Sequence, residues 1–451
     1  MTESKFVNSL ESMTTDLHLW DIPSTQVGIT ATKIINYYPL TAIVNTDTIT
    51  FNIPGQNKLM LDHIDIVSKI KINHNDVANN HQPESQVGVN NNLAHSLWRN
   101  VSVVIGGTNI TQSFDYSYCI SAFFDTIMNA TAERADTLLY QQAFLMDEAK
   151  DKQASESLII YEVAEVAADD TKNIQASPFK PVGNPSAAKR IERFAKSEAQ
   201  TRVGTLIAPL AVSLFQQHKL LPDNLDIQIG LTKKEPKFCL QAAGNTDEKI
   251  TIVDVYLKVH YKVPVDAALE AIELRLKREP CRYEAEAKIV TFHQFPYGTT
   301  SHTFHHLFTG KLPKFFVAAV NNRAAYAGNS HRNPWTFMPI AKVQCHVNGT
   351  EYFPKAVEGQ EELFNAFQEA LGYKLKGSCL IRSDIFGIHN MVPFTLTSDR
   401  TIRHHMNLMS TGVVDLEIDL TAATGADYAL IVYAIYDRLI EIDNYRQIKL
   451  I

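Results

Sequence analysis

The sequence lacks the cysteine patterns and long apolar runs that mark several protein classes. Its 451 residues include only five cysteines without a CxxC pair, which favours reduced, buried thiols over a zinc ribbon or a disulfide framework. No apolar run approaches the roughly 20 residues that span a bilayer, and residues 1–20 lack the apolar stretch of a secretory signal. We therefore expect that the chain has no membrane span and that it is made inside the cell.

The chain also lacks an excess of positive charge and the short motifs of common enzymes. Lys and Arg total 42 against 49 Asp and Glu, a net charge of -7, which argues against wholesale neutralisation of nucleic acid. No Walker A loop, GxSxG, Rossmann GxGxxG or cupin-type HxH motif occurs. We expect no enzyme, no catalytic residue, no cofactor, no metal site and no sequence-specific binding of nucleic acid.

The residues that are present predict an all-β chain. Short segments rich in β-branched and aromatic residues recur, and turn residues such as Pro54-Gly55 separate them. Convincing helical periodicity is found in only a few places. The main predicted strands are 48–53, 58–72, 101–105, 225–232, 250–263, 287–295, 314–320, 341–347, 413–421 and 428–436.

The second half of the chain repeats the first, beginning with a tight hairpin. VSVVI-GG-TNI turns at Gly106-Gly107, and VQCHV-NG-TEY turns at Asn348-Gly349. Such residues are typical of two-residue turns, which need positive φ. An amphipathic helix is predicted after each hairpin. Its apolar residues are Tyr116, Ile120, Phe123, Phe124 and Ile127 in the first half, and Leu363, Phe364, Phe367 and Leu371 in the second.

Two later strands repeat in the same order. Asp226–Thr232 (DIQIGLT) resembles Asp415–Thr421 (DLEIDLT), and each is followed by a long strand, at Val255–Tyr261 and at Leu430–Tyr436. Chance similarity between β-rich segments is the alternative, but it does not account for a shared order of four elements. The sequence predicts two tandem β-sandwiches, in residues 1–264 and 265–451.

The two copies differ in one region and are joined by another. The first copy is longer after its hairpin, and the surplus fits a polar segment at about 147–202. We expect this segment to leave the sandwich as a long solvated insertion. The joint falls near Pro264–Pro280, where Leu269, Ile272 and Leu276 form one helical stripe and predict a short linker helix.

Histidine clusters are the first candidates for a site. His302, His305 and His306 include a pair at helical spacing, but the segment has no HExxH pattern and no acidic ligand nearby in sequence. Solvated or interfacial histidines are therefore favoured over a metal site. His404 and His405 follow two arginines and form a weaker cluster, which would tune a contact between subunits through pH.

Charged and aromatic segments are the remaining candidates. The acidic stretch Asp437–Asp443 could receive a positive partner, although an acidic strand end is a sufficient explanation. A basic run could bind nucleic acid or an anionic surface, but interleaved glutamates favour a salt-bridged, exposed helix face: Lys189, Arg190, Arg193 and Lys196. Five aromatic residues could line a carbohydrate groove, but a sandwich core is favoured: Phe315, Phe316, Trp335, Phe337 and Phe353.

Five sequence blocks form a recognisable combination. They are DLHLWDIPSTQVGI (Asp16–Ile29), ITFNIPGQNKLMLDHIDIVSKIKI (Ile49–Ile72), LAHSLWRNVSVVIGGTNIT (Leu93–Thr111), the Leu-Pro and Asn-Pro-Trp phrase of Leu307–Phe337, and the closing strand Asp427–Ile451. Together they resemble the major capsid proteins of adintoviruses and Polinton (Maverick) elements over nearly the whole chain. Departures from the family pattern are Gly106, where Asn is common, and Trp98 and Trp335, where Phe is common.

The resemblance implies an all-β double jelly roll. This fold has two tandem antiparallel eight-stranded β-sandwiches, with short helices and one long loop insertion. The resemblance further implies a hexon-like homotrimer that forms pseudo-hexagonal capsomers and tiles the icosahedral capsid of a virion around double-stranded DNA. Neighbouring capsomers and a single-jelly-roll penton protein at the vertices would be its partners.

Two other functions stay open on the sequence alone. A cellular tandem β-sandwich that binds glycans or proteins would be a monomer or dimer with an exposed aromatic groove. A metal-dependent jelly-roll enzyme would hold its metal through His305 or His306.

Overall fold

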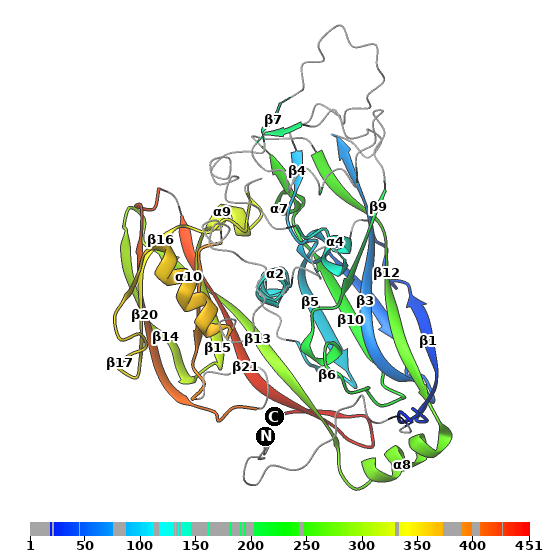
Figure 1. Cartoon of the computed structure of the whole chain (residues 1–451). Helices are drawn as coiled ribbons and strands as arrows, with labels where there is room; N and C mark the ends of the chain where they lie inside the picture. Colours follow the sequence, from blue (N-terminus) through cyan, green and yellow to red (C-terminus); the bar gives the residue numbers. More distant parts are fainter. Residues whose placement is uncertain are drawn as a thin grey trace.

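Two β-sandwiches standing side by side make up the body of the chain (Figure 1). The computed structural model describes residues 19, 22–44, 46–74, 87–111, 117–129, 131, 134, 137–145, 160–162, 180–182, 190, 194, 203–242, 248–329, 333–372, 389–398, 406–425 and 427–451. No helix within these ranges is long and apolar enough to cross a bilayer.

The first sandwich consists of two four-stranded antiparallel sheets with the orders β1-β12-β3-β9 and β2-β10-β5-β6. Their strands are β1 (Ile29–Tyr37), β2 (Thr48–Ile53), β3 (Met60–His74), β5 (Trp98–Ile105), β6 (Thr108–Asn109), β9 (Gly204–Pro209), β10 (Ile227–Lys233) and β12 (Glu248–Pro264). Two short pairs join β4 (Val87–Val89) to β11 (Leu240–Ala242) and β7 (Ile160–Glu162) to β8 (Lys180–Val182).

The second sandwich repeats this topology strand for strand. Its sheet orders are β13-β21-β15-β19 and β14-β20-β16-β17, with β22 added to β21 and β18 added to β16. The strands are β13 (Cys281–Phe295), β14 (Ser301–Lys311), β15 (Phe315–Asn322), β16 (Ile340–Val347), β17 (Thr350–Glu351), β18 (Val357–Glu358), β19 (Met391–Thr395), β20 (Thr411–Leu420), β21 (Tyr428–Ile442) and β22 (Ile448–Leu450).

The repeat seen in the sequence corresponds to equivalent places in the two sandwiches. Ile227–Lys233 (β10) lies between β2 and β5, and Thr411–Leu420 (β20) lies between β14 and β16. Likewise β12 lies between β1 and β3, and β21 lies between β13 and β15. Two four-stranded sheets packed face to face with this strand order form a jelly roll, so the predicted fold class is confirmed.

Both predicted hairpins turn in two residues of positive φ. Gly106 and Gly107 have φ of 55° and 81°, and Asn348 and Gly349 have φ of 53° and 77°. Such turns match the right-handed twist of the flanking strands. Gly106 is needed for a second reason, because a Cβ there would lie 2.6 Å from the carbonyl oxygen of Arg446.

The two predicted amphipathic helices are α2 (Ser117–Asn129) and α10 (Gly359–Ala370). The helix expected at the joint is α8 (Asp266–Leu276), in which Leu276 is buried while Leu269 and Ile272 are half-buried. Tyr116 lies outside the described residues. Short helical segments complete the structure: α1 (Leu93–Ser96), α4 (Leu138–Gln141), η3 (Ser213–Phe215), α7 (Pro236–Cys239) and α9 (Arg323–Tyr326).

The predicted insertion at 147–202 falls mostly outside the described residues. Within it, Arg190 is described and is fully buried. Its Nε donates to the carbonyl oxygen of Val89 at 2.9 Å, and its Nη1 donates to that of Leu145 at 3.0 Å. The prediction of an exposed position was wrong for Arg190, because its guanidinium is buried and bonds to backbone carbonyls. The other three cations of the run lie outside the described residues.

Candidate functional site

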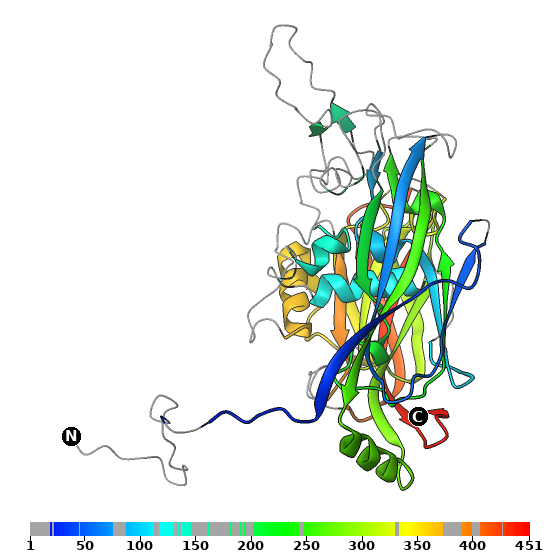
Figure 2. The same cartoon turned by 90° about the vertical axis from the view of Figure 1, so that its right-hand side faces the viewer.

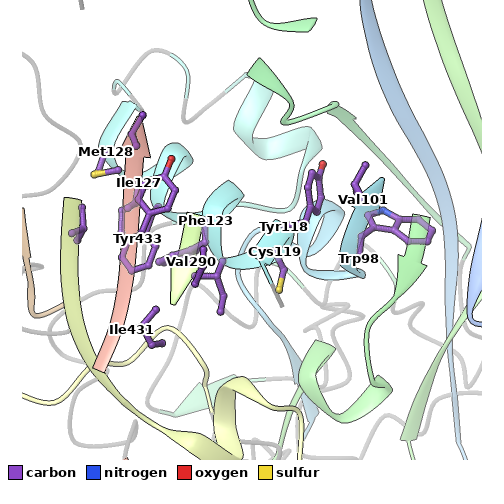
Figure 3. Packing of buried hydrophobic residues seen from close by; sticks show 14 of the residues in the cluster. Trp98, Val101, Tyr118, Cys119, Phe123, Ile127, Met128, Val290, Ile431 and Tyr433 are labelled. Carbon is purple, nitrogen blue, oxygen red and sulfur yellow. The ribbon is translucent and has the colours of Figure 1, made fainter. Parts of the chain in front are cut away.

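Helix α2 belongs to the first sandwich but lies between the two sandwiches (Figure 1). Figure 3 shows Tyr118 and Cys119 of α2 on the side of Trp98 in β5, while Ile127 and Met128 lie near Tyr433 of β21. All of these side chains are buried. A helix with one apolar face normally leaves its other face in solvent. Here the second sandwich covers that other face, and α2 connects the two bodies.

Aromatic rings from both halves of the chain stack in this junction. Phe123 of α2 stacks on Trp335 with ring centroids 3.9 Å apart and planes 5° from parallel. Phe124 stacks on Tyr433 at 5.6 Å and on Phe337 at 5.8 Å. Trp335 and Phe337 were predicted as core of a sandwich, and they are buried, but the rings they stack on belong to α2 of the other half.

A largely buried ion pair crosses the same junction. Asp125 of α2 accepts hydrogen bonds from the Nζ of Lys288 in β13 and, at 2.5 Å, from the hydroxyl of Tyr433. Burial acts to lower the pKa of Lys288, but the carboxylates of Asp125 and Glu286 outweigh it and raise that pKa above its usual value. Burial, with the charge of Asp125, raises the pKa of Tyr433 well above its usual value. Asp125 therefore neutralises a lysine that has lost most of its water.

A second ion pair extends this network within the C-terminal sandwich. Lys314 lies 3.0 Å from Glu286 and 2.7 Å from Asp437, and the Lys314 and Asp437 side chains are less than a tenth exposed. Burial acts to raise the pKa of Asp437, but its hydrogen bonds to Lys314 and Asn407 lower that pKa overall. Asp437, predicted as part of an acidic strand end, thus has a partner inside its own chain.

Two arginines add contacts between the halves. Arg438 of β21 donates to the carbonyl oxygen of Ile110 at 2.9 Å. Arg446 contacts Asp223 of the first half at 2.8 Å, and within its own half it binds Glu273 of α8 at 2.5 Å. Together with the contacts of α2, these bonds connect the two sandwiches at several separate places. What the arrangement can do is mechanical, since it holds two sandwiches in one fixed relation.

His95 of α1 is buried beside α2 and makes the stability of the N-terminal sandwich sensitive to acid. Its Nδ1 lies 3.0 Å from the hydroxyl of Tyr118, and burial lowers its pKa to about 4. In the unfolded chain it titrates near 6.5, so the unfolded state binds the proton first and stability falls as the pH drops from 6.5 toward 4.

We predict a loss of about 2 kcal/mol at pH 5 relative to pH 7.5 from His95 alone. His95→Gln should flatten this dependence, measured by urea unfolding at both pH values. His218→Gln provides the control, since it makes the same substitution at an exposed position outside the core. An equally steep dependence in His95→Gln would contradict the assignment.

The predicted histidine cluster lies on a strand and not on a helix. His302 in β14 packs its ring against Phe304, with centroids 4.6 Å apart. The backbone N of His306 donates to Asp415 at 2.7 Å, while the His305 side chain is 71% exposed and 3.8 Å from the same carboxylate. The spacing of His302 and His306 is that of a helix, but both residues lie in β14. The pairing of β14 with β20 is irregular after Phe304. His404 and His405 lie outside the described residues.

The five aromatic residues weighed as a carbohydrate groove or as core do not form an exposed surface. Four of the five aromatic residues are at most 2% exposed, and Phe353 is half-buried. They are core residues, as the sequence favoured, and this leaves a glycan-binding function without its expected surface.

Sequence reasoning missed a cluster in the first sandwich, formed by His63, Asp65 and His260. His63 of β3 pairs with His260 of β12 across the sheet, and possible ligand atoms of all three residues lie within 4.8 Å of one another. The two imidazole rings are stacked 4.0 Å apart and 15° from parallel. Their in-plane lone pairs therefore run side by side and do not converge on one ion. These residues could hold a divalent metal only after one ring turned. The pairing of β3 with β12 brings them together, and no local sequence pattern indicates it.

Comparison with known proteins gives matches in structure and none in sequence. No family model matches the chain, and no curated protein matches it. A chain of the Sputnik virophage matches with a TM-score of 0.67 and 11% identity over 99% of this chain and 93% of that chain. The fold is the double jelly roll.

Two further double jelly rolls match at full length. A chain of the PBCV-1 virus capsid has a TM-score of 0.60 and 11% identity over 96% of this chain and 98% of that one. The mavirus major capsid protein has a TM-score of 0.55 and 12% identity over 100% and 97%. Such low identities leave the shared fold as the finding.

Proposed function

We propose that this chain is the major capsid protein of an icosahedral DNA virus or virus-like element of the adintovirus or Polinton type. The observation that carries the proposal is the double jelly roll, which aligns with viral capsid chains over 96% to 100% of this chain. The narrower lineage rests on the sequence blocks at both ends and in the middle of the chain.

In this proposal, residues 1–264 and 265–451 are two jelly rolls of one hexon-like subunit. Three subunits form a pseudo-hexagonal trimer, and trimers tile the shell of the virion around double-stranded DNA, with a single-jelly-roll penton protein at the vertices. Obligate interfaces of this kind commonly bury more than about 2,000 Å². The proposal assigns no enzyme activity, no catalytic residue, no cofactor and no sequence-specific contact with nucleic acid.

The junction supports a shell function in physical terms. Small angular errors add up across the many contacts of a shell, so a shell subunit needs a fixed angle between its two sandwiches. Close packing makes interiors resist such distortion. Stacked rings and buried ion pairs at α2 provide that resistance here.

Light scattering on the purified chain tests this function. We expect a stable trimer, and hexagonal capsomers or shells by electron microscopy under assembly conditions. A monomer that binds oligosaccharides would contradict the proposal and favour a cellular binding module.

A further inference from the structure

We propose that helix α10 of one chain packs on the outer face of strands β1 and β12 of a second chain, as α2 packs on β13 and β21 within one chain. The inference rests on the proposed capsomer and names the surfaces that would form it. It follows from the exact correspondence between the two sandwiches.

Strand register makes this correspondence explicit. Val255–Tyr261 and Leu430–Tyr436 are repeats of each other, which places His260 in β12 where Ile435 stands in β21. The neighbouring strands then align through their pairing with these two. The equivalent residues are Ile34 and Lys288, His63 and Phe315, Asp65 and Val317, and Lys258 and Tyr433.

An ion pair present in both sandwiches supports this register. Lys314 and Asp437 lie 2.7 Å apart in the second sandwich. At the equivalent positions of the first sandwich, Asp62 and Lys262 lie 3.5 Å apart, with the two charges exchanged. The pair recurs at the same place, although both residue types have changed.

The equivalent faces differ in what covers them. In the second sandwich, α2 lies against the face, and Phe315, Val317 and Tyr433 are at most 1% exposed. In the first sandwich, Ile34 is 50% exposed and the His63 side chain is 42% exposed. Figure 2 shows this face toward the viewer, with β1 in dark blue at the surface. Within the described residues, α2 therefore covers the face of the second sandwich, while the equivalent face of the first sandwich stays partly exposed.

Helix α10 is the second helix of the repeat. It follows its hairpin as α2 does, and it buries Leu363 and Phe367 on its own sandwich. Its exposed residues include Glu361 and Glu369. The face of β12 that we assign to it carries Lys258, while His260 on the same face lies 3.2 Å from the carboxylate of Asp65. Glu361 and Glu369 of the helix are complementary in charge to Lys258.

The position of the two surfaces permits a closed ring. Figure 1 shows α10 on the second sandwich and β1 at the far side of the first sandwich. A contact between different surfaces of identical chains is head-to-tail, and it produces a ring when the rotation closes. With α2 inside each chain and α10 between chains, the same helix–sheet contact would occur six times in a trimer.

Charge reversal tests the contact. Glu361→Lys combined with Glu369→Lys should raise the concentration at which trimers dissociate at least tenfold, measured by analytical ultracentrifugation, and Lys258→Glu should do the same. All three changes in one chain should restore assembly, because the reversed charges again attract. Glu270→Lys, on the exposed side of α8, provides a matched control without effect.

The outcomes separate this inference from the capsomer itself. If the wild type is a trimer and both charge reversals leave it unchanged, with melting curves showing folded protein, the α10 contact is wrong and the capsomer stands. If the two reversals weaken the trimer and the combined variant does not recover, the surfaces do not face each other. A wild type that stays monomeric overturns the capsomer and this contact together.

Discussion

Trp335→Ala should lower the free energy of unfolding by about 4 kcal/mol, the range of large aromatic deletions in a core. Trp335 is 2% exposed, and its Nε1 donates to the carbonyl oxygen of Asn91 at 3.2 Å in addition to the stack on Phe123. Both contacts join the C-terminal half to the N-terminal half. The substitution should therefore uncouple the sandwiches, and calorimetry should show two unfolding transitions where the wild type shows one.

Trp98→Ala is the matched control for this result. Trp98 is fully buried at the start of β5, within the first sandwich. Its loss should cost a similar free energy while the second sandwich keeps its own transition temperature. Trp335→Phe should retain the stack and lose only the hydrogen bond, at about 1 kcal/mol. A single transition of unchanged midpoint in Trp335→Ala would show that the indole does not couple the halves.

The features predicted from sequence are those that neighbouring residues determine. The turns at Gly106-Gly107 and Asn348-Gly349 require positive φ, a property of the two residues themselves. The repeat of Asp226–Thr232 and Asp415–Thr421 needed only comparison within the chain, and it places both strands correctly. Alternation of apolar residues was sufficient to predict an all-β fold.

The candidate site could not be predicted in the same way, because it depends on contacts between distant segments. The pattern of α2 predicts one buried face, and nothing local indicates that a second sandwich covers the other. Charges interleaved around Arg190 favour exposure, while its hydrogen bonds are made to carbonyls far away in sequence. His63 and His260 meet only through the register of β3 with β12.

Asp125→Asn should be the second most damaging substitution of the junction, at about 3 kcal/mol. The amide keeps the shape of the carboxylate but removes its charge, and Lys288, whose side chain is 12% exposed, is left with Glu286 at 3.9 Å as its nearest acidic group. Breaking one partner of a buried pair costs far more than the pair contributes, because the remaining charge has lost most of its water and keeps only the more distant Glu286 as a counterion. Chemical denaturation at neutral pH measures the loss.

Two further variants distinguish this cause from loss of shape. Asp125→Asn combined with Lys288→Met removes both charges and should recover much of the stability, since apolar replacements of buried pairs are often neutral. Glu279→Gln breaks an exposed pair, in which the Glu279 side chain is 45% and the Arg275 side chain 79% exposed, and should have little effect on stability. If Asp125→Asn were as mild as Glu279→Gln, the ion pair would not hold the sandwiches together, and the rigidity of the subunit would rest on the aromatic stack alone.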